Sequence, residues 1–150
     1  MGVIGNRYLQ GSPILPYANV KAYPNTDIFM DLQFVDHTNT PVVPITINIE
    51  IDDITNSVVL PNCGPIALNA LGAVGSAGSP FTYPAFAASM YLQVLASAWQ
   101  MTMPYVGSQL CQVGMQFTAT DSVTGQTFTG TGIVAVIELC ALATVSGLAY

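Results

Sequence analysis

Hydrophobic and polar residues alternate along two segments in the first third of the chain. In the segment from 27 to 34, the apolar side consists of Ile28, Met30, Leu32 and Phe34, and the polar side carries Asp27, Asp31 and Gln33. In the second segment, the apolar side consists of Ile45, Ile47, Ile49 and Ile51, separated by Thr46, Asn48 and Glu50. A period of two with β-branched residues on one side is typical of a half-buried strand and leaves little room for a helix. We therefore predict two strands whose apolar sides face the core.

A polar turn follows the second of these strands. The run from Asp52 to Ser57 precedes a short apolar stretch, Val58 to Leu60, which predicts a hairpin. We expect Asp52 and Asp53 to accept hydrogen bonds in the turn. Adjacent residues of a strand face opposite sides, so these two carboxylates cannot share a proton as a catalytic pair would.

The last third of the chain contains another alternating segment and its partner. The apolar side of this segment consists of Cys111, Val113, Met115 and Phe117. The run from Asp121 to Gly125 predicts a tight turn in which the glycine adopts a positive φ. A return strand rich in Thr, Val and Ile should then extend from Gln126 to Leu139.

The middle of the chain has weaker patterns. Residues 66–71 suggest a short strand, and the glycine- and serine-rich run 72–80 suggests a flexible loop. The stretch 85–101 fits an amphipathic helix or a strand. We favour a strand over 90–95, with Met90, Leu92 and Val94 inward, followed by an irregular segment that carries Trp99.

Short strands separated by turns, without alternation of strand and helix, predict an all-β fold, an antiparallel sandwich. We place this domain at 25–140. Glycine or proline interrupts the preceding segment at six positions, which excludes a helix or a long strand. Residues 1–24 are therefore expected to form an extended N-terminal arm, either mobile or laid across a neighbouring subunit. Residues 141–150 form a C-terminal tail.

The chain carries few charges for a protein of its size. Only 7% of its 150 residues are charged and 51% are hydrophobic, whereas about a quarter of residues are charged in typical globular proteins. Arg7 and Lys21 are the only basic residues against eight Asp and Glu, which gives a net charge of −6. Such a surface suits a membrane protein, a disordered chain, or a domain that other protein chains cover.

The third explanation fits best. The most apolar run, Gly132 to Tyr150, contains Glu138 and has no flanking Lys or Arg to anchor a span. The start of the chain lacks the continuous apolar core of a secretory signal. The abundance of Val, Ile, Leu and Phe argues against disorder. An acidic chain also repels phosphate backbones, so we expect neither membrane nor direct nucleic-acid contact.

Residues suited to catalysis are sparse. The only histidine, His37, lies in a predicted turn, where we expect it to be solvated. In the catalytic alternative, Asp36 or Asp31 would orient its ring for a distant Ser or Cys nucleophile. The sequence contains no HExxH motif, phosphate-binding glycine loop or nucleophile elbow. We therefore predict that the protein is not an enzyme.

Metal and cofactor sites are not expected either. Cys63, Cys111 and Cys140 form no CxxC pair, and we interpret them as small buried hydrophobic residues rather than as a disulfide or metal site. The acidic residues are scattered apart from Asp52 and Asp53, and their spacing does not match a calcium-binding loop.

Two turn motifs resemble a known group of proteins. They read F-x-D-x-x-N-x-P-x-x-P and I-D-D-x-T-N, and consist of Phe34, Asp36, Asn39, Pro41, Pro44, Ile51, Asp52, Asp53, Thr55 and Asn56. Together with the apolar strand near 91–95 and the stretch 113–139, they resemble small immunoglobulin-like β-sandwich proteins encoded among the structural genes of tailed bacteriophages. The resemblance covers 27–139, and the apolar insert 63–88 departs from it.

This resemblance implies an immunoglobulin-like fold and a non-enzymatic virion protein, assembled in the host cytoplasm. Such a protein binds major capsid or neck and tail subunits, as a capsid decoration (cement) protein or as a neck or tail component, and commonly as a homo-oligomer. The apolar arm residues are candidates for the interface, namely Tyr8, Leu9, Ile14, Leu15 and Tyr17. The alternative is a cell-surface or secreted adhesive module that binds glycans through Trp99 and nearby tyrosines.

Overall fold

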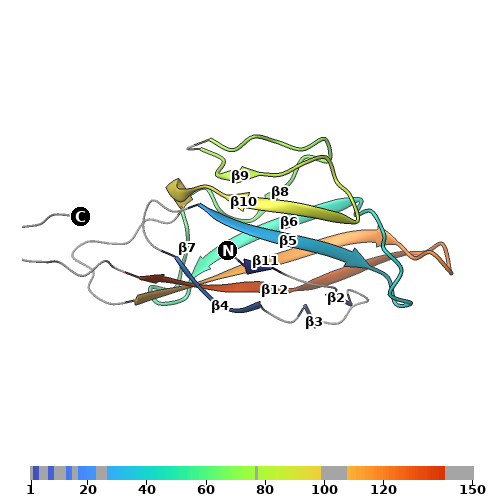
Figure 1. Ribbon diagram of the computed structural model, residues 1–150, viewed down its shortest axis with the longest axis horizontal. Coiled ribbons are helices and arrows are strands. Elements are labelled where there is room, and N and C mark those ends of the chain that lie inside the picture. The colour runs from blue at the N-terminus through green and yellow to red at the C-terminus, as the bar shows by residue number, and fades with distance from the viewer. Residues whose placement is uncertain are drawn as a thin grey trace, which may run out of the picture.

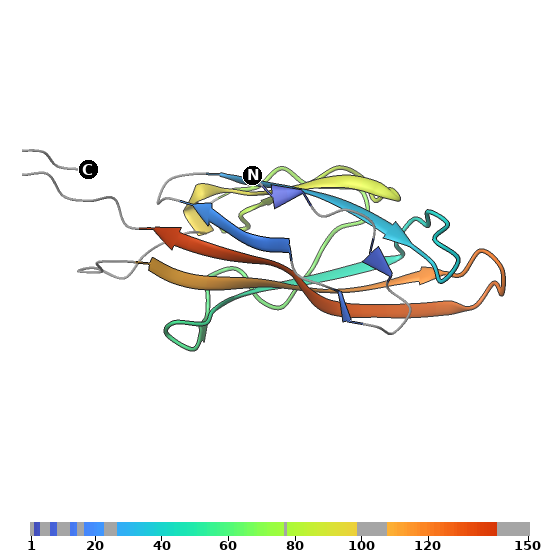
Figure 2. The same cartoon turned by 60° about the horizontal axis from the view of Figure 1, so that its bottom comes forward.

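The computed structural model describes residues 2–3, 7–8, 13–14, 17–22, 27–76, 78–98 and 108–140, with side chains for 27–76, 78–98 and 110–138. The described part consists mainly of strands, which form two sheets that face each other (Figures 1 and 2). The prediction of an all-β fold with antiparallel sheets is confirmed. None of the described residues forms a helix long and apolar enough to cross a bilayer.

The first sheet is organised around β5 and β10. It contains β1 (Gly2–Val3), β2 (Arg7–Tyr8), β5 (Ile28–Val35), β9 (Phe81–Thr82) and β10 (Ser89–Val94). β10 pairs antiparallel with β5 on one side and with β9 on the other. The predicted strand over 90–95 is confirmed, and the 3-10 turn η1 (Ala96–Ala98) begins two residues after the end of β10. Trp99, the proposed glycan contact of the alternative hypothesis, lies outside the described residues.

The second sheet is built on the long hairpin of β11 and β12. It contains β3 (Pro13–Ile14), β4 (Tyr17–Ala22), β6 (Thr46–Asp53), β7 (Val58–Val59), β8 (Ile66–Ala67), β11 (Ser108–Thr120) and β12 (Thr127–Cys140). β11 lies between β12 and β6, and β7 and β8 both pair with β6. The predicted hairpin after β6 and the predicted return strand are therefore confirmed.

The expectation of an arm that is mobile or laid across a neighbouring subunit was wrong for the described N-terminal segments, because they pair with both sheets of the same chain. β1 and β2 run parallel to β5, whereas β3 and β4 run parallel to β12. Figure 2 shows these short strands along the side of the sandwich where β5 and β12 lie. Each of the two edges thus gains backbone partners from residues 1–24, and an edge strand without partners invites pairing with another chain.

The predicted interface residues of the arm are only partly described. Tyr8, Ile14 and Tyr17 belong to β2, β3 and β4. Leu9 and Leu15 lie outside the described residues, as does the tail 141–150. The role of these five residues in an interface therefore stays a prediction.

The core lies between the two sheets and includes most of the side chains that were predicted to face inward. In β5, β10 and β11, the residues at alternate positions are buried, including Met30, Leu92 and Val113. The rings of Phe34 in β5 and Phe117 in β11 meet across the two layers with centroids 4.9 Å apart. Strict alternation therefore directs one face of each sheet into a common core.

One prediction for an individual position was wrong. Ile45 is not inward: it precedes β6, its side chain is 52% exposed, and its N–H donates to the carbonyl of Thr118. The described residues of the predicted loop 72–80 form no regular strand, and they fold back with backbone hydrogen bonds between Ala73 and Tyr83 and between Ser76 and Ser79. Composition alone could not reveal these non-local backbone partners.

The bulge in the second sheet explains one break in alternation. The register between β11 and β12 shifts at Val113 and Gly114, so that Val134 has no direct partner. Val134 and Ala135 are consequently both buried, although they are adjacent in sequence. An extra residue in one strand changes the face of the sheet toward which the following side chains point.

The contact between the two sheets predicts a large effect of truncating Phe117. Because this side chain is fully buried and packs on Phe34 and Phe128, Phe117→Ala should lower the free energy of unfolding by about 3–5 kcal/mol. Urea unfolding followed by fluorescence measures this change. The control Val123→Ala, at a position 69% exposed, should stay within about 0.5 kcal/mol of the parent. Similar effects of the two substitutions would contradict this core assignment.

Candidate functional site

Four polar residues connect two loops at one end of the sandwich. Asp36 and His37 follow β5, whereas Asp121 and Ser122 begin the turn between β11 and β12. Both loops lie at the right-hand end of the molecule in Figure 1. We refer to Asp36, His37, Asp121 and Ser122 as the loop cluster.

Asp36 is the hydrogen-bond acceptor at the centre of this cluster and is fully buried. Its Oδ1 accepts from the N–H groups of Thr38 at 2.9 Å and Thr40 at 3.0 Å, and from the Thr38 hydroxyl at 2.7 Å. Its Oδ2 accepts from the N–H of Ser122 at 3.0 Å and from the Ser122 hydroxyl. One carboxylate therefore shapes its own loop and holds the neighbouring turn.

Asp121, in the other loop, accepts the corresponding hydrogen bonds. Its Oδ1 accepts from the N–H groups of Val123 at 2.8 Å and Thr124 at 2.9 Å, while its Oδ2 pairs with Nδ1 of His37. Gly125 has a φ of 70°, as predicted for this turn, and its N–H donates to the carbonyl of Asp121. Each aspartate thus orders its own turn and binds a residue of the other.

These contacts stabilise the ionised carboxylates. Burial by itself would raise the pKa of Asp36, but hydrogen bonds from Ser122, Thr38 and Thr40 outweigh it and hold the pKa well below its ordinary value. Burial opposes ionisation of Asp121 as well, and the N–H groups of Thr124 and Val123 together with His37 lower the pKa of Asp121. The cluster therefore combines two ionised acceptors with a histidine.

The environment of His37 differs from the prediction. Its side chain is 31% exposed rather than fully solvated, and its carboxylate partner is Asp121 rather than Asp36 or Asp31. Ser122, the nearby hydroxyl, donates to Asp36. A serine nucleophile requires a hydrogen bond to its base, and here Ser122 and His37 bind different carboxylates. The arrangement connects two loops across 84 residues of sequence.

A second polar site lies on the outer face of the β6, β11 and β12 strands. A shallow groove of about 340 Å³ passes over Asn48, Glu50, Asp52, Gly114, Gln116 and Thr131, among others. Glu50 and Asp52 are two residues apart in β6, which places both carboxylates on this outer face. We refer to this site as the carboxylate groove.

The two carboxylates of the groove are coupled. A hydrogen bond with Asp52, followed by burial and the negative charge of Asp52, raises the pKa of Glu50. The pair of Glu50 with Asp52 was not predicted, although their spacing of two residues in a strand places both carboxylates on the same face. Among the side chains described, no group of three or more His, Cys, Asp or Glu is placed to hold a metal ion.

The remaining expectations for Asp53 and the cysteines are met where side chains are described. Asp53 is buried and accepts from Asn56 through its N–H at 3.1 Å and its Nδ2 at 2.7 Å, as a turn acceptor. Cys63 and Cys111 are free and buried. Burial raises the pKa of the Cys63 thiol to about 11 and that of Cys111 to about 12, which disfavours the reactive thiolate.

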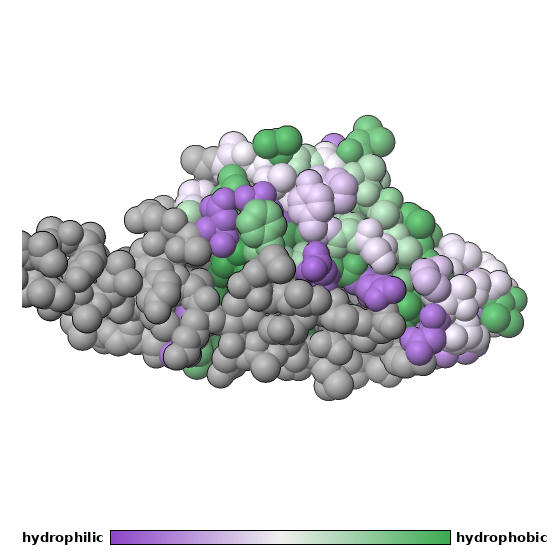
Figure 3. Space-filling view, viewed as in Figure 1, coloured by the Kyte–Doolittle hydropathy of each residue, from purple (hydrophilic) through white to green (hydrophobic). Residues whose placement is uncertain are grey.

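The surface of the described domain combines exposed apolar side chains with acidic groups. Figure 3 shows hydrophobic and hydrophilic residues side by side on one face. The large apolar side chains exposed to solvent are Phe29, Val43, Ile45, Ile54, Val58, Val59, Leu71, Val74, Tyr91, Leu110 and Val123. No Lys or Arg occurs after position 21. The charges of the sandwich are therefore almost entirely negative.

Comparisons with known proteins add no assignment. No protein-family model matches the chain, and no curated protein is detectably similar to it.

The loop cluster predicts a loss of stability in acid. Because folding lowers the pKa of Asp36 and Asp121, their contribution is present above the ordinary value of 3.8 and is lost as the pH falls toward the folded-state pKa. Asp36→Asn should be less stable at neutral pH and show a weaker dependence between about pH 5 and pH 2. Urea unfolding across that range measures both. Asp31→Asn removes an exposed carboxylate and is the control for net charge; an equal change would contradict this role of Asp36.

The carboxylate groove predicts the opposite dependence of stability on pH. Folding raises the pKa of Glu50 above its ordinary 4.5, so the associated stability is present below that value and is lost as the pH rises through the folded-state pKa. Asp52→Asn should therefore increase the melting temperature at neutral pH and reduce its decline on going from mildly acidic to neutral pH. Asp31→Asn again controls for charge. A lower melting temperature of Asp52→Asn at neutral pH would show that the pair is not repulsive.

Proposed function

We propose that this chain is a non-enzymatic structural protein of a tailed-bacteriophage virion that binds neighbouring virion subunits. The observation that carries this proposal is the surface: large apolar side chains are exposed in both sheets and in the loops of the described domain, and the chain has only two basic residues. Large exposed apolar areas mark interaction sites in soluble proteins. A symmetric assembly that covers such a surface removes it from water.

We further propose that the sandwich is immunoglobulin-like, and the strand order supports this. Immunoglobulin-type domains carry strands A, B, E and D in one sheet and G, F and C in the other, with C′ beside C. Taking β5 as B, the neighbours β10 and β9 take the places of E and D. In the other sheet β12, β11, β6 and β7 take the places of G, F, C and C′.

The residues that resemble the bacteriophage proteins have structural roles that are consistent with this proposal. Phe34 is in the core, Asp36 organises the loop cluster, and Asp53 accepts the hydrogen bonds of its turn. The motifs thus encode a rigid sandwich with fixed loops. A rigid body suits a capsid decoration protein or a neck or tail component, which transmits load between neighbours and performs no chemistry.

The loop cluster and the thiols support a role without catalysis. Ser122 and His37 engage separate carboxylates, and burial keeps the thiols of Cys63 and Cys111 protonated. These four described groups therefore hold the loops together or lie in the core.

Deletion of residues 1–24 tests the proposal. The truncated protein keeps β5, β6, β10, β11 and β12 and the core between the two sheets, so circular dichroism should show that it stays folded. It should nevertheless fail to enter particles when it replaces the full chain. Removing β1–β4 also exposes the edges of β5 and β12, so light scattering should reveal self-association.

A substitution control separates the side chains of the arm from its backbone. Replacing Tyr8, Leu9, Ile14, Leu15 and Tyr17 by serine keeps the backbone that pairs with both edges while removing apolar area that would contribute about 25 cal/mol per Å² at an interface. This variant should remain monodisperse but lose incorporation. Normal incorporation of the truncated protein would refute the proposed role of the arm.

A further inference from the structure

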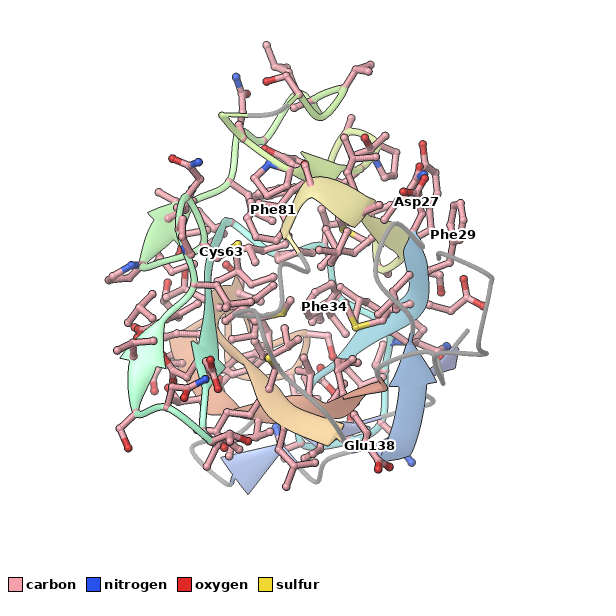
Figure 4. All side chains as sticks on the ribbon, turned by 90° about the vertical axis from the view of Figure 1, so that its left-hand side faces the viewer. Asp27, Phe29, Phe34, Cys63, Phe81 and Glu138 are labelled. Carbon is pink, nitrogen blue, oxygen red and sulfur yellow. The ribbon has the colours of Figure 1, made fainter. Side chains whose placement is uncertain are left out.

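Two aromatic rings lie on the outer face of the first sheet, where the remaining residues are polar. Phe29 in β5 is 39% exposed and Tyr91 in β10 is 42% exposed. Figure 4 shows Phe29 and Asp27 pointing away from the core, in which Phe34 and Phe81 lie. We refer to Phe29, Asp31, Tyr91 and Gln93 as the aromatic face.

The strand register places these four side chains together. Tyr91 lies directly opposite Asp31, and Gln93 lies directly opposite Phe29. All four side chains occupy outward-facing positions, because Met30 and Leu92, their neighbours in the two strands, are fully buried. Side chains opposite each other on one face have Cβ atoms about 4.5–5.5 Å apart. An aromatic ring and a carboxylate are therefore adjacent on a flat surface.

The groups around this face hold it in place. Gln93 donates from Nε2 to Oδ2 of Asp27 at 2.7 Å, and the other oxygen of Asp27 accepts from the N–H of Ala96 at 2.8 Å. Within the part of the chain that the structure describes, no hydrogen bond or ion pair engages the carboxylate of Asp31. The Tyr91 ring thus lies opposite a carboxylate that accepts no hydrogen bond from the described side chains.

The charge balance indicates which partner this face suits. The chain has a net charge of −6, and its only basic residues are Arg7 and Lys21. A positively charged partner is attracted to such a surface, and complementary charge raises the rate of encounter. A neutral sugar would gain nothing from that field.

Arginine fits the local geometry better than lysine. Its planar guanidinium stacks on an aromatic ring and simultaneously presents N–H groups at its edge to a carboxylate. Tyr91 and Asp31, opposite each other on neighbouring strands, offer that combination. Lysine has a compact charge and cannot make the stacked, bidentate contact.

We propose that the aromatic face binds arginine side chains presented by a positively charged partner protein. This inference rests on the proposed function, since it specifies the chemistry of a neighbouring subunit that the sandwich would bind. The face lies on the first sheet, on β5 and β10, and its recognition does not require the arm residues assigned to the interface above.

Binding of peptides to the full-length protein tests the inference. A dye-labelled arginine-rich peptide and a lysine-rich peptide of the same length and charge are titrated with protein, and fluorescence anisotropy reports binding. The arginine peptide should bind more tightly. Tyr91→Ala and Asp31→Asn should each weaken its binding by roughly three- to ten-fold and reduce the preference over lysine.

Matched variants separate this contact from general attraction between charges. Asp52→Asn removes the same charge from the opposite sheet, and Val123→Ala truncates an exposed apolar residue elsewhere; neither should change the preference for arginine. Equal binding of both peptides, or an equal loss in Asp52→Asn and Asp31→Asn, would overturn the proposal. Because these titrations involve no particle, such a failure leaves the virion assignment to be decided by whether the full chain is incorporated into particles.

The proposal would also be overturned if the aromatic face bound either of two other partners. If neutral oligosaccharides bind and Tyr91→Ala abolishes that binding while the arginine peptide is ignored, the face recognises glycans. If the protein alone self-associates in sedimentation experiments and either Tyr91→Ala or Arg7→Gln abolishes it, the occupant is a second copy of this chain. Preferential, Tyr91-dependent binding of the arginine peptide by a monomeric protein supports the proposal.

Discussion

Packing of the two sheets against each other is the constraint on which the rest of this structure depends. Each sheet has one apolar face because its strands alternate, and neither face is stable in water alone. The contact of Phe34 with Phe117 lies at the centre of this packing. Once the two faces meet, the register of each strand is fixed, because a slip of one residue would expose its apolar side. Outward positions such as Phe29 and Asp31 follow from the same register.

The loop cluster has a different physical basis, since it depends on the satisfaction of buried polar groups. Asp36 has no exposed surface, and burying a carboxylate is costly unless donors surround it. The required donors come from its own loop and from Ser122, which lies far away in sequence. Two loops that would otherwise vary independently are thereby held together, and this rigidity is what a structural component of an assembly requires.

Acidic residues have distinct structural roles despite their common charge. Asp36 and Asp121 are buried, ionised acceptors in the loop cluster, whereas Glu50 lies in an open groove where Asp52 raises its pKa. Asp31 lies beside an aromatic ring on the other sheet. The shortage of basic residues leaves these carboxylates to hydrogen-bond donors within the chain or to partners outside it, which connects the charge imbalance of the sequence with the proposed assembly.

The sequence by itself determined the five main strands β5, β6, β10, β11 and β12, most of their inward positions and the turns at 52–57 and 121–125, because alternation and turn preferences are local properties of the chain. It also identified Asp53 as a turn acceptor and Cys63 and Cys111 as buried. Only the tertiary structure decided that His37 pairs with Asp121, that Ile45 is exposed and that 72–80 folds back on itself. These features depend on partners brought together by sheet packing, and no local pattern encodes which distant residue will supply them.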